Sequence, residues 1–191
     1  MTDINLKLVV GSSAARRPAG GSAEVDERAV IELIELLFFA YRDFVSEPDE
    51  ILKDLGFGRA HHRVIHFVGR NPGIRVAELL DILRITKQSL ARVLRELIET
   101  GHVCQRTGKA DRRQRLLYLT DRGKELHWRL IEPQMARVRE AVDRSGADGE
   151  AAFRDVLLRL IDAGDRAHVL ALAERAGRKR KRAGESDDGG A

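Results

Sequence analysis

Two short apolar stripes joined by a tight link constrain the fold of this chain more than any other feature. The segment RVAELLDILR carries apolar residues at positions i, i+3, i+4 and i+7, and the segment TKQSLARVLRELIETG repeats this spacing. Such a period is typical of a helix with one buried face. Thr86 can cap the second helix and Gly101 can end it. The two segments together predict a helix-turn-helix.

The period of the apolar residues changes to two after Gly101, which favours strands. Residues 102–106 and 115–119 are the strand candidates, and the turn between them reads TGKADRRQ. Four cations lie within seven residues here: Lys109, Arg112, Arg113 and Arg115. Like charges this close repel one another, so we expect an anionic partner such as phosphate. The sequence therefore predicts a β-hairpin with a basic tip.

Further helices are predicted on both sides of this unit. Residues 25–46 are apolar nearly all round, which favours burial at a subunit interface, although a central core helix is the alternative. A helix over 59–69 stops at a proline–glycine turn. After the hairpin, Thr120 caps a long helix in which Pro133 predicts a kink or break. A last helix is expected over about 150–175.

These elements divide the chain into one domain and two tails. Residues 1–24 and 176–191 lack hydrophobic periodicity and are predicted to be disordered. The expected fold class is mainly α, a winged helix-turn-helix with a small β-hairpin wing and N- and C-terminal dimerisation helices. The expected bounds are about 25–175 for the domain, about 56–120 for the winged helix-turn-helix, and about 25–50 and 121–175 for the dimerisation helices.

Charge is distributed unevenly along the chain. The formal net charge of the 191 residues is +4, yet the stretch from Arg59 to Arg115 holds 13 Lys and Arg against 5 Asp and Glu. A local excess of this kind favours nucleic acid as a partner. The cluster RKRKR at 178–182 is a second basic site, and its role stays open.

Several classes of protein are disfavoured by what the sequence lacks. It has no run of eighteen apolar residues and no signal-peptide pattern, so we expect no membrane partner and a cytoplasmic location. It has no catalytic or nucleotide-binding motif, so we expect that the protein is not an enzyme and that it binds no cofactor. His62 and His66 lie four residues apart but lack further ligands, so no metal site is expected. Cys104 is expected to be a packed, inert thiol.

The polar face of the second stripe helix carries side chains suited to DNA. At 100° per residue, Gln88, Arg92 and Arg95 project opposite the apolar stripe. Arginine pairs with guanine and glutamine with adenine, whereas hydroxyls and helix N-terminal amides bind phosphate. A solvated helix face has a similar composition, but the adjacent basic hairpin favours DNA. The candidate DNA-binding residues are Thr86, Lys87, Gln88, Ser89, Arg92, Arg95, Arg112, Arg113 and Arg115.

The string DRRQRLLYLT and the order of the elements resemble the MarR family of winged helix-turn-helix transcriptional regulators. The wing signature of that family, Asp-x-Arg-x-x-x-Leu-x-Leu-Thr, is matched by Asp111, Arg113, Leu117, Leu119 and Thr120. The resemblance implies that Arg113 enters the minor groove and that Asp111 organises the wing by pairing with a nearby arginine. It extends over about 28–145, and the stretch LGFGRAHHRVIHFVGRNPG resembles a PetP-like branch of the family.

The function implied by this resemblance is sequence-specific regulation of transcription. Such a protein would be a homodimer that represses a palindromic operator in double-stranded DNA, modulated by a small aromatic or anionic effector. The candidate effector pocket is formed by Phe38, Tyr41, Arg42, His62 and His66. The alternative is a nonspecific nucleoid-type protein dominated by its basic tail and wing. A steep salt dependence with little sequence preference would favour that alternative.

Overall fold

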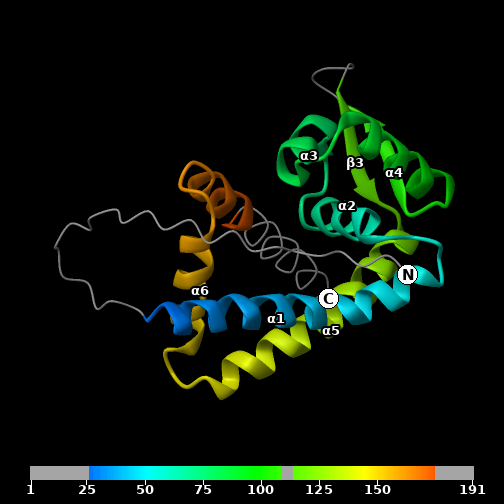
Figure 1. Ribbon diagram of the computed structural model, residues 1–191. Coiled ribbons are helices and arrows are strands. Elements are labelled where there is room, and N and C mark those ends of the chain that lie inside the picture. The colour runs from blue at the N-terminus through cyan, green and yellow to red at the C-terminus, as the bar shows by residue number, and fades with distance from the viewer. Residues whose placement is uncertain (1–25, 109–113, 175–191) are drawn as a thin grey trace, which may run out of the picture. The chain divides into compact units, whose positions relative to one another are not determined.

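A computed structural model describes residues 26–108 and 114–174 of this protein (Figure 1). The elements are α1 (Glu27–Lys53), α2 (Arg59–Arg70), β1 (Ile74–Arg75), α3 (Val76–Leu83), α4 (Lys87–Glu99), β2 (Val103–Thr107), β3 (Arg115–Leu119), α5 (Asp121–Arg144) and α6 (Gly149–Leu160). The predicted class, mainly α with a small antiparallel sheet, is confirmed. The predicted tails and the wing residues Asp111, Arg112 and Arg113 lie outside the described residues. The chain forms two units that divide after Phe39.

The predicted helix-turn-helix is present, with α3 and α4 joined by a short turn. Thr86 is the N-cap of α4, and its hydroxyl accepts a hydrogen bond from the Ser89 backbone N–H at 3.1 Å. Arg84 ends α3 in the left-handed conformation, with φ of 50°. The faces of the two helices that turn inward are formed by Leu79, Leu83, Leu90, Val93, Leu94 and Leu97. Burial of this stripe leaves the opposite face of α4 exposed to solvent.

The sheet has one more strand than the predicted hairpin. Strands β2 and β3 pair antiparallel, with Val103 opposite Leu119 and Thr107 opposite Arg115. The two-residue strand β1 pairs with the other edge of β3, so the strand order is β1-β3-β2. Gly73 makes this approach possible, because its φ is +83° and its N–H donates to the Leu117 carbonyl at 2.8 Å. A strand of two residues is too short to show alternation in the sequence.

Helix α5 runs from Asp121 to Arg144 without a break at Pro133. Of the kink or break predicted there, the break was wrong, since the neighbouring residue Gln134 is buried and its Nε2 donates to the Phe44 carbonyl of α1 at 3.2 Å. These tertiary contacts keep the helix continuous despite the lost backbone donor. Its start follows the sequence prediction, because the Thr120 hydroxyl accepts a hydrogen bond from the Gly123 N–H at 3.0 Å.

Helix α1 and the C-terminal segment also differ from the predicted bounds. Helix α1 continues through Pro48 to Lys53, because Leu52 in its last turn is fully buried in the core. The single helix expected over 150–175 was wrong. It is interrupted after Leu160 by an extended residue and a turn, and residues 166–174 are helical again. The Arg166 side chain satisfies the end of α6 by donating to the carbonyls of Arg159 and of the C-cap residue Ile161, both at 2.9 Å.

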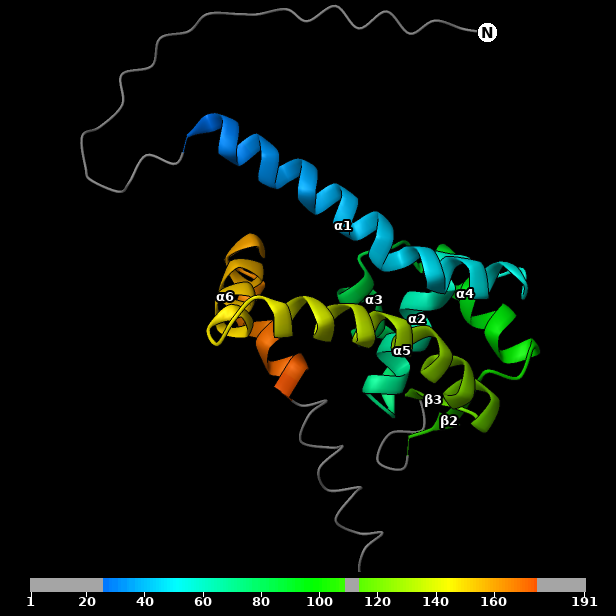
Figure 2. The same cartoon turned by 90° about the horizontal axis from the view of Figure 1, so that it is seen from below.

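One hydrophobic core holds the winged helix-turn-helix together. Figure 1 shows α2, α3 and α4 around the sheet. Leu52 from α1, Leu97 from α4, Leu117 from β3 and Leu130 from α5 all have an exposed fraction of 0%. The second half of α1 contacts α5 at one place (Figure 2), where Arg137 donates to the Glu47 carboxylate at 2.8 Å. The exposed face of α4 is therefore presented by a packed scaffold.

Candidate DNA interface

An open cleft lined mainly by polar side chains lies on the outward face of α4. It has a volume of about 530 Å³ and is lined by Gln88, Ser89, Ala91, Arg92 and Arg95. Each of these residues is exposed, while Leu90 and Val93 between them are buried. The helix thus divides its side chains sharply, with leucine and valine packed inward and long hydrogen-bond donors directed to solvent. Donors of this kind can contact base edges or phosphates.

The N-terminus of α4 gathers the hydroxyls predicted to contact phosphate. The Thr86 hydroxyl donates to the Ser89 hydroxyl at 2.9 Å while it accepts from the Ser89 backbone N–H. Lys87 occupies the first position of the helix and is exposed. Free amides and a positive dipole end make such a terminus attractive to an anion. The structure brings Thr86, Lys87 and Ser89 together with the donors of the cleft.

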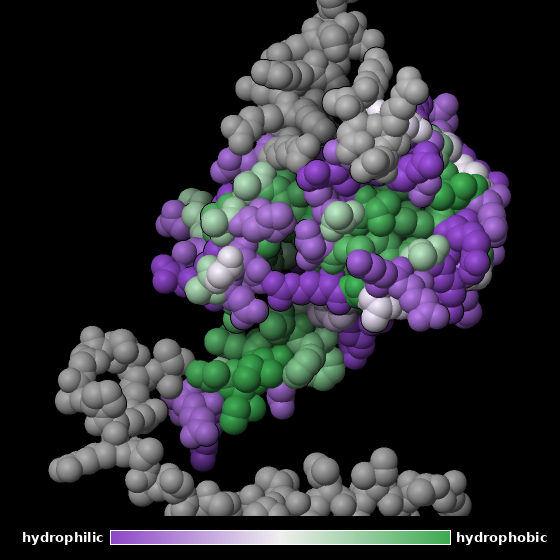
Figure 3. All heavy atoms as spheres, turned by 90° about the horizontal axis from the view of Figure 1, so that it is seen from above, coloured by the Kyte–Doolittle hydropathy of each residue, from purple (hydrophilic) through white to green (hydrophobic). Residues whose placement is uncertain are grey.

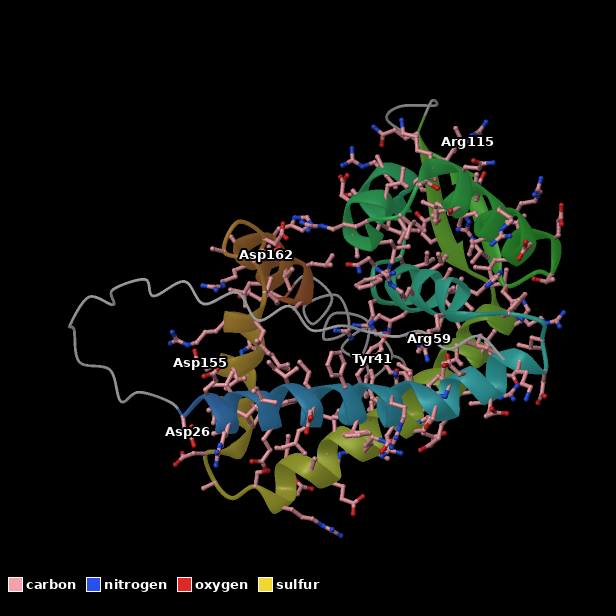
Figure 4. All side chains as sticks on the ribbon, in the orientation of Figure 1. Asp26, Tyr41, Arg59, Arg115, Asp155 and Asp162 are labelled. Carbon is pink, nitrogen blue, oxygen red and sulfur yellow. The ribbon has the colours of Figure 1, made fainter. Side chains whose placement is uncertain are left out.

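The wing contributes arginines on strands rather than on helices. Arg115 is exposed at the start of β3 (Figure 4), and its Nη1 donates to the Thr107 hydroxyl across the hairpin at 3.2 Å. Arg106 on β2 is also exposed, and its guanidinium lies 4.9 Å from the centre of the Tyr118 ring. The sequence analysis did not select Arg106. Its signal was the strand alternation, which places Arg106 on the face opposite to the buried Val103.

The residues of the candidate effector pocket come from both units of the chain. Phe38 belongs to the first unit and is 69% exposed. Tyr41 lies under the Arg59 guanidinium, with 5.8 Å from its carbon to the ring centre, and Figure 4 labels both residues. Arg42 donates to the Asp43 carboxylate at 2.8 Å. His62 and His66 are half-buried on α2.

The histidines of α2 face a further histidine on α5. The ring centres of His66 and His127 are 5.7 Å apart. Burial lowers the pKa of His66 to about 4, and the neighbouring charges of His127, His62 and Arg70 act in the same direction. Burial likewise lowers the pKa of His62 and of His127. These imidazoles are therefore neutral at pH 7 and would not attract an anion by their own charge.

An open apolar groove of about 640 Å³ lies next to His66. Helices α5 and α6 and residues 166–174 form most of it, including Ile131, Val138, Phe153, Leu157 and Val169. No group of three or more His, Cys, Asp or Glu side chains that could hold a metal ion occurs among residues 26–108 and 114–174. In the same part of the chain, no helix is long and apolar enough to cross a membrane.

The family of this chain follows from its similarity to known proteins. A sequence model of the MarR family matches residues 55–114, the stretch that contains α2 to β2. The HTH-type transcriptional regulator PetP of Rhodobacter capsulatus is 47% identical over 141 residues, which cover 74% of this chain and 85% of that protein. The chain belongs to the MarR family. This MarR-family protein is a transcriptional regulator that binds DNA, and the family consists of regulators rather than enzymes.

Solved structures agree with this fold. The Streptococcus pneumoniae protein FabT, crystallised in complex with DNA, superposes with a TM-score of 0.61 at 19% identity, covering 69% of this MarR-family chain and 94% of FabT. The crystal structure of MarR superposes with a TM-score of 0.50 at 25% identity, covering 86% of this chain and 99% of MarR. The winged helix-turn-helix architecture is thus shared with both.

Proposed function

We propose that this MarR-family regulator binds a palindromic operator as a homodimer and represses transcription. The observation that carries the proposal is the exposed donor face of α4, where Gln88, Arg92 and Arg95 line one cleft on a helix whose other face is packed. The major groove admits an α-helix, and each base pair presents a distinct hydrogen-bonding pattern there. Base reading is therefore assigned to these side chains.

Phosphate contacts are assigned to the residues around that face. Thr86, Lys87 and Ser89 lie at the N-terminus of α4, and Arg115 lies exposed at the start of β3. Arg112 and Arg113 lie two to three positions before Arg115 in the sequence, and we assign Arg113 to the minor groove. Positive side chains on both sides of the recognition helix would hold it in register on the duplex.

The dimer is supported by apolar side chains that this chain leaves exposed. In α1, Leu33 is 61% and Leu36 is 54% exposed, and in α6, Val156 is 54% and Leu160 is 63% exposed. Figure 3 shows hydrophobic side chains gathered in patches on the surface. Exposed apolar patches of this kind mark interaction sites, and a second copy of the chain is the simplest cover. A two-fold dimer reads an operator with the same symmetry.

Repression follows from the geometry of such a complex. A dimer with two recognition helices and two wings covers a continuous stretch of DNA, and RNA polymerase cannot use a promoter that overlaps it.

A regulator of this kind acts where the chromosome lies, so we assign it to the cytoplasm.

An effector is assigned to the apolar groove beside His66, together with Tyr41, Arg42 and His62 of the same unit. Because burial keeps the pKa of His66 at about 4, an aromatic molecule fits better than one held by imidazolium charge. Titration with benzoate and with indole, followed by DNA-binding anisotropy, tests this assignment. Release of DNA by neither probe would count against an aromatic effector.

Selection of bound duplexes from a random pool tests the function itself. We expect a two-fold symmetric consensus, and we expect Arg92→Ala and Arg95→Ala to relax preference at particular positions of it. Binding to all sequences alike, with a steep dependence on salt, would instead indicate the nonspecific nucleoid-type protein. Truncation before the cluster at 178–182 separates the specific regulator from the nonspecific protein. For the specific regulator, the truncation should lower affinity for all DNA sequences equally and leave the preference for the operator intact.

The wing provides a second test, in which the sign of the effect decides. Arg113→Ala should weaken operator binding by about 1–3 kcal/mol. Asp111→Ala removes a negative charge near phosphates, so simple electrostatics predicts tighter binding. If Asp111 organises the wing arginines, binding should weaken instead. Titrations at one salt concentration, with helicity checked by circular dichroism, distinguish these results.

A further inference from the structure

A buried histidine connects helix α2 to the recognition helix α4. His61 lies in the first turn of α2 and is 7% exposed. Its Nε2 lies 2.7 Å from Oε2 of Glu96 on α4, and its ring stacks on Phe57 with 4.6 Å between the ring centres. These contacts place the Glu96 carboxylate at the boundary between the packed scaffold and the exposed face of α4.

The hydrogen-bond pattern decides which group donates. Nδ1 of His61 accepts a hydrogen bond from the Gly58 backbone N–H at 3.1 Å, so this nitrogen carries no proton. The ring proton is then on Nε2, which donates to Glu96. One oxygen of Glu96 is thus held by a side chain that is itself fixed by the backbone and by stacking.

The other oxygen of Glu96 faces the DNA-reading side. Oε1 lies 4.0 Å from Nε of Arg92, one turn earlier on the same helix. Arg92 lines the cleft of α4, and its side chain is 69% exposed. Arg95 lines the same cleft but makes no ion pair within the part of the chain that the structure describes. The two arginines therefore differ in a way that their sequence positions do not reveal.

We infer that Glu96 is a positioning residue that orients Arg92 for base recognition and is itself anchored by His61. This inference rests on the proposed reading role of Arg92. A long side chain that is restrained before binding loses less rotamer freedom when it meets its base, so discrimination improves. The carboxylate also opposes phosphate binding, so its presence on the DNA-facing helix requires a compensating role, either orienting Arg92 or tethering α4 to α2.

The test compares operator preference, base by base, for the wild type, Arg92→Ala, Glu96→Ala and the double variant, using duplexes selected by the wild type. Glu99→Ala is the matched control, since it removes the same charge from an exposed site one turn along α4. We expect Glu96→Ala to reduce preference about two- to fivefold at the same base pairs as Arg92→Ala. The double variant should be no worse than Arg92→Ala alone.

The conservative variant Glu96→Gln separates positioning from helix tethering. Its amide oxygen can still accept from His61, whereas its charge for Arg92 is gone. Continued loss of preference in Glu96→Gln, with a wild-type melting temperature, supports positioning. Wild-type preference in Glu96→Gln, or the same behaviour of Glu96→Ala and Glu99→Ala, would overturn this inference but leave the reading role of Arg92 intact. No change in Arg92→Ala at any base pair would overturn the reading role of Arg92 together with the inference.

Discussion

The winged helix-turn-helix and the C-terminal helix α6 differ in how far their apolar side chains are buried. In the first region, Leu97 and Leu117 are completely buried by residues of the same chain. In the second, none of the residues of α6 from Gly149 to Leu160 is buried, and Leu160 is 63% exposed. The core under the DNA-reading region is therefore completed within one chain, with Leu52 of α1 and Leu130 of α5, whereas α6 and the first half of α1 present apolar surfaces that require another cover. This difference motivates the dimer in the proposed function.

The largest expected effect contrasts the two regions directly. Leu117→Ala in β3 should lower the free energy of unfolding by about 2–5 kcal/mol, because it leaves a cavity in a packed core. Leu160→Ala in α6 removes the same atoms from an exposed site, and it should change the stability of the isolated chain by less than about 0.5 kcal/mol. Urea unfolding at low protein concentration measures both. Equal effects would show that the contrast in burial has no energetic meaning.

The second prediction concerns pH and His66, a half-buried histidine of α2. The unfolded imidazole of His66 binds a proton near pH 6.5, but the folded one does so only at about 4. Between these values the unfolded state binds more protons, so the free energy of unfolding falls as the pH falls. The loss should reach about 3 kcal/mol below pH 4.

His66→Gln is the variant that checks this assignment. It should flatten the dependence of stability on pH between about 6.5 and 4, while burial of His62 and His127 leaves part of it. His168→Gln, at an exposed position of the C-terminal segment, is the control. An unchanged slope in His66→Gln would contradict the burial argument for that group.

The third prediction tests whether a second copy of the chain buries the exposed apolar side chains of α1. Leu33→Glu places a charge among exposed apolar side chains, so the dissociation constant of the dimer should rise at least tenfold, or about 1.4 kcal/mol. Glu35→Lys alters the same helix without removing an apolar contact and serves as the control. Sedimentation equilibrium measures the mass. A wild-type monomer at micromolar concentration, with full helicity, would be incompatible with the dimer.

The smallest expected effect concerns a helix cap inside the reading region. Thr86→Ala removes the acceptor of the Ser89 N–H, so it should cost about 1 kcal/mol of stability. Ser145→Ala removes a hydroxyl at the exposed end of α5, where no backbone donor depends on it among the described residues, and should cost less. Thermal unfolding followed by circular dichroism compares the two. A cost for Ser145→Ala equal to that of Thr86→Ala would contradict the capping role.

The sequence alone was sufficient for structure that depends on near neighbours. The apolar stripes of α3 and α4, the caps at Thr86 and Thr120, and the pairing of β2 with β3 all follow from residues a few positions apart. Local propensity and periodicity carry this information. The wing signature at residues 111–120 was also sufficient to indicate the family, which the relatives then established.

Tertiary structure decided what depends on residues distant in the chain. Strand β1 exists because Ile74 meets Leu117, and α5 passes Pro133 where Gln134 is anchored to α1. The contact between His61 and Glu96 joins residues 35 positions apart, so no period or spacing could have indicated it. Likewise, the pattern showed that 25–46 is apolar, but its exposure in a single chain appears only when every other element is placed. Burial and long-range hydrogen bonds are properties of the assembled molecule, and local sequence does not encode them.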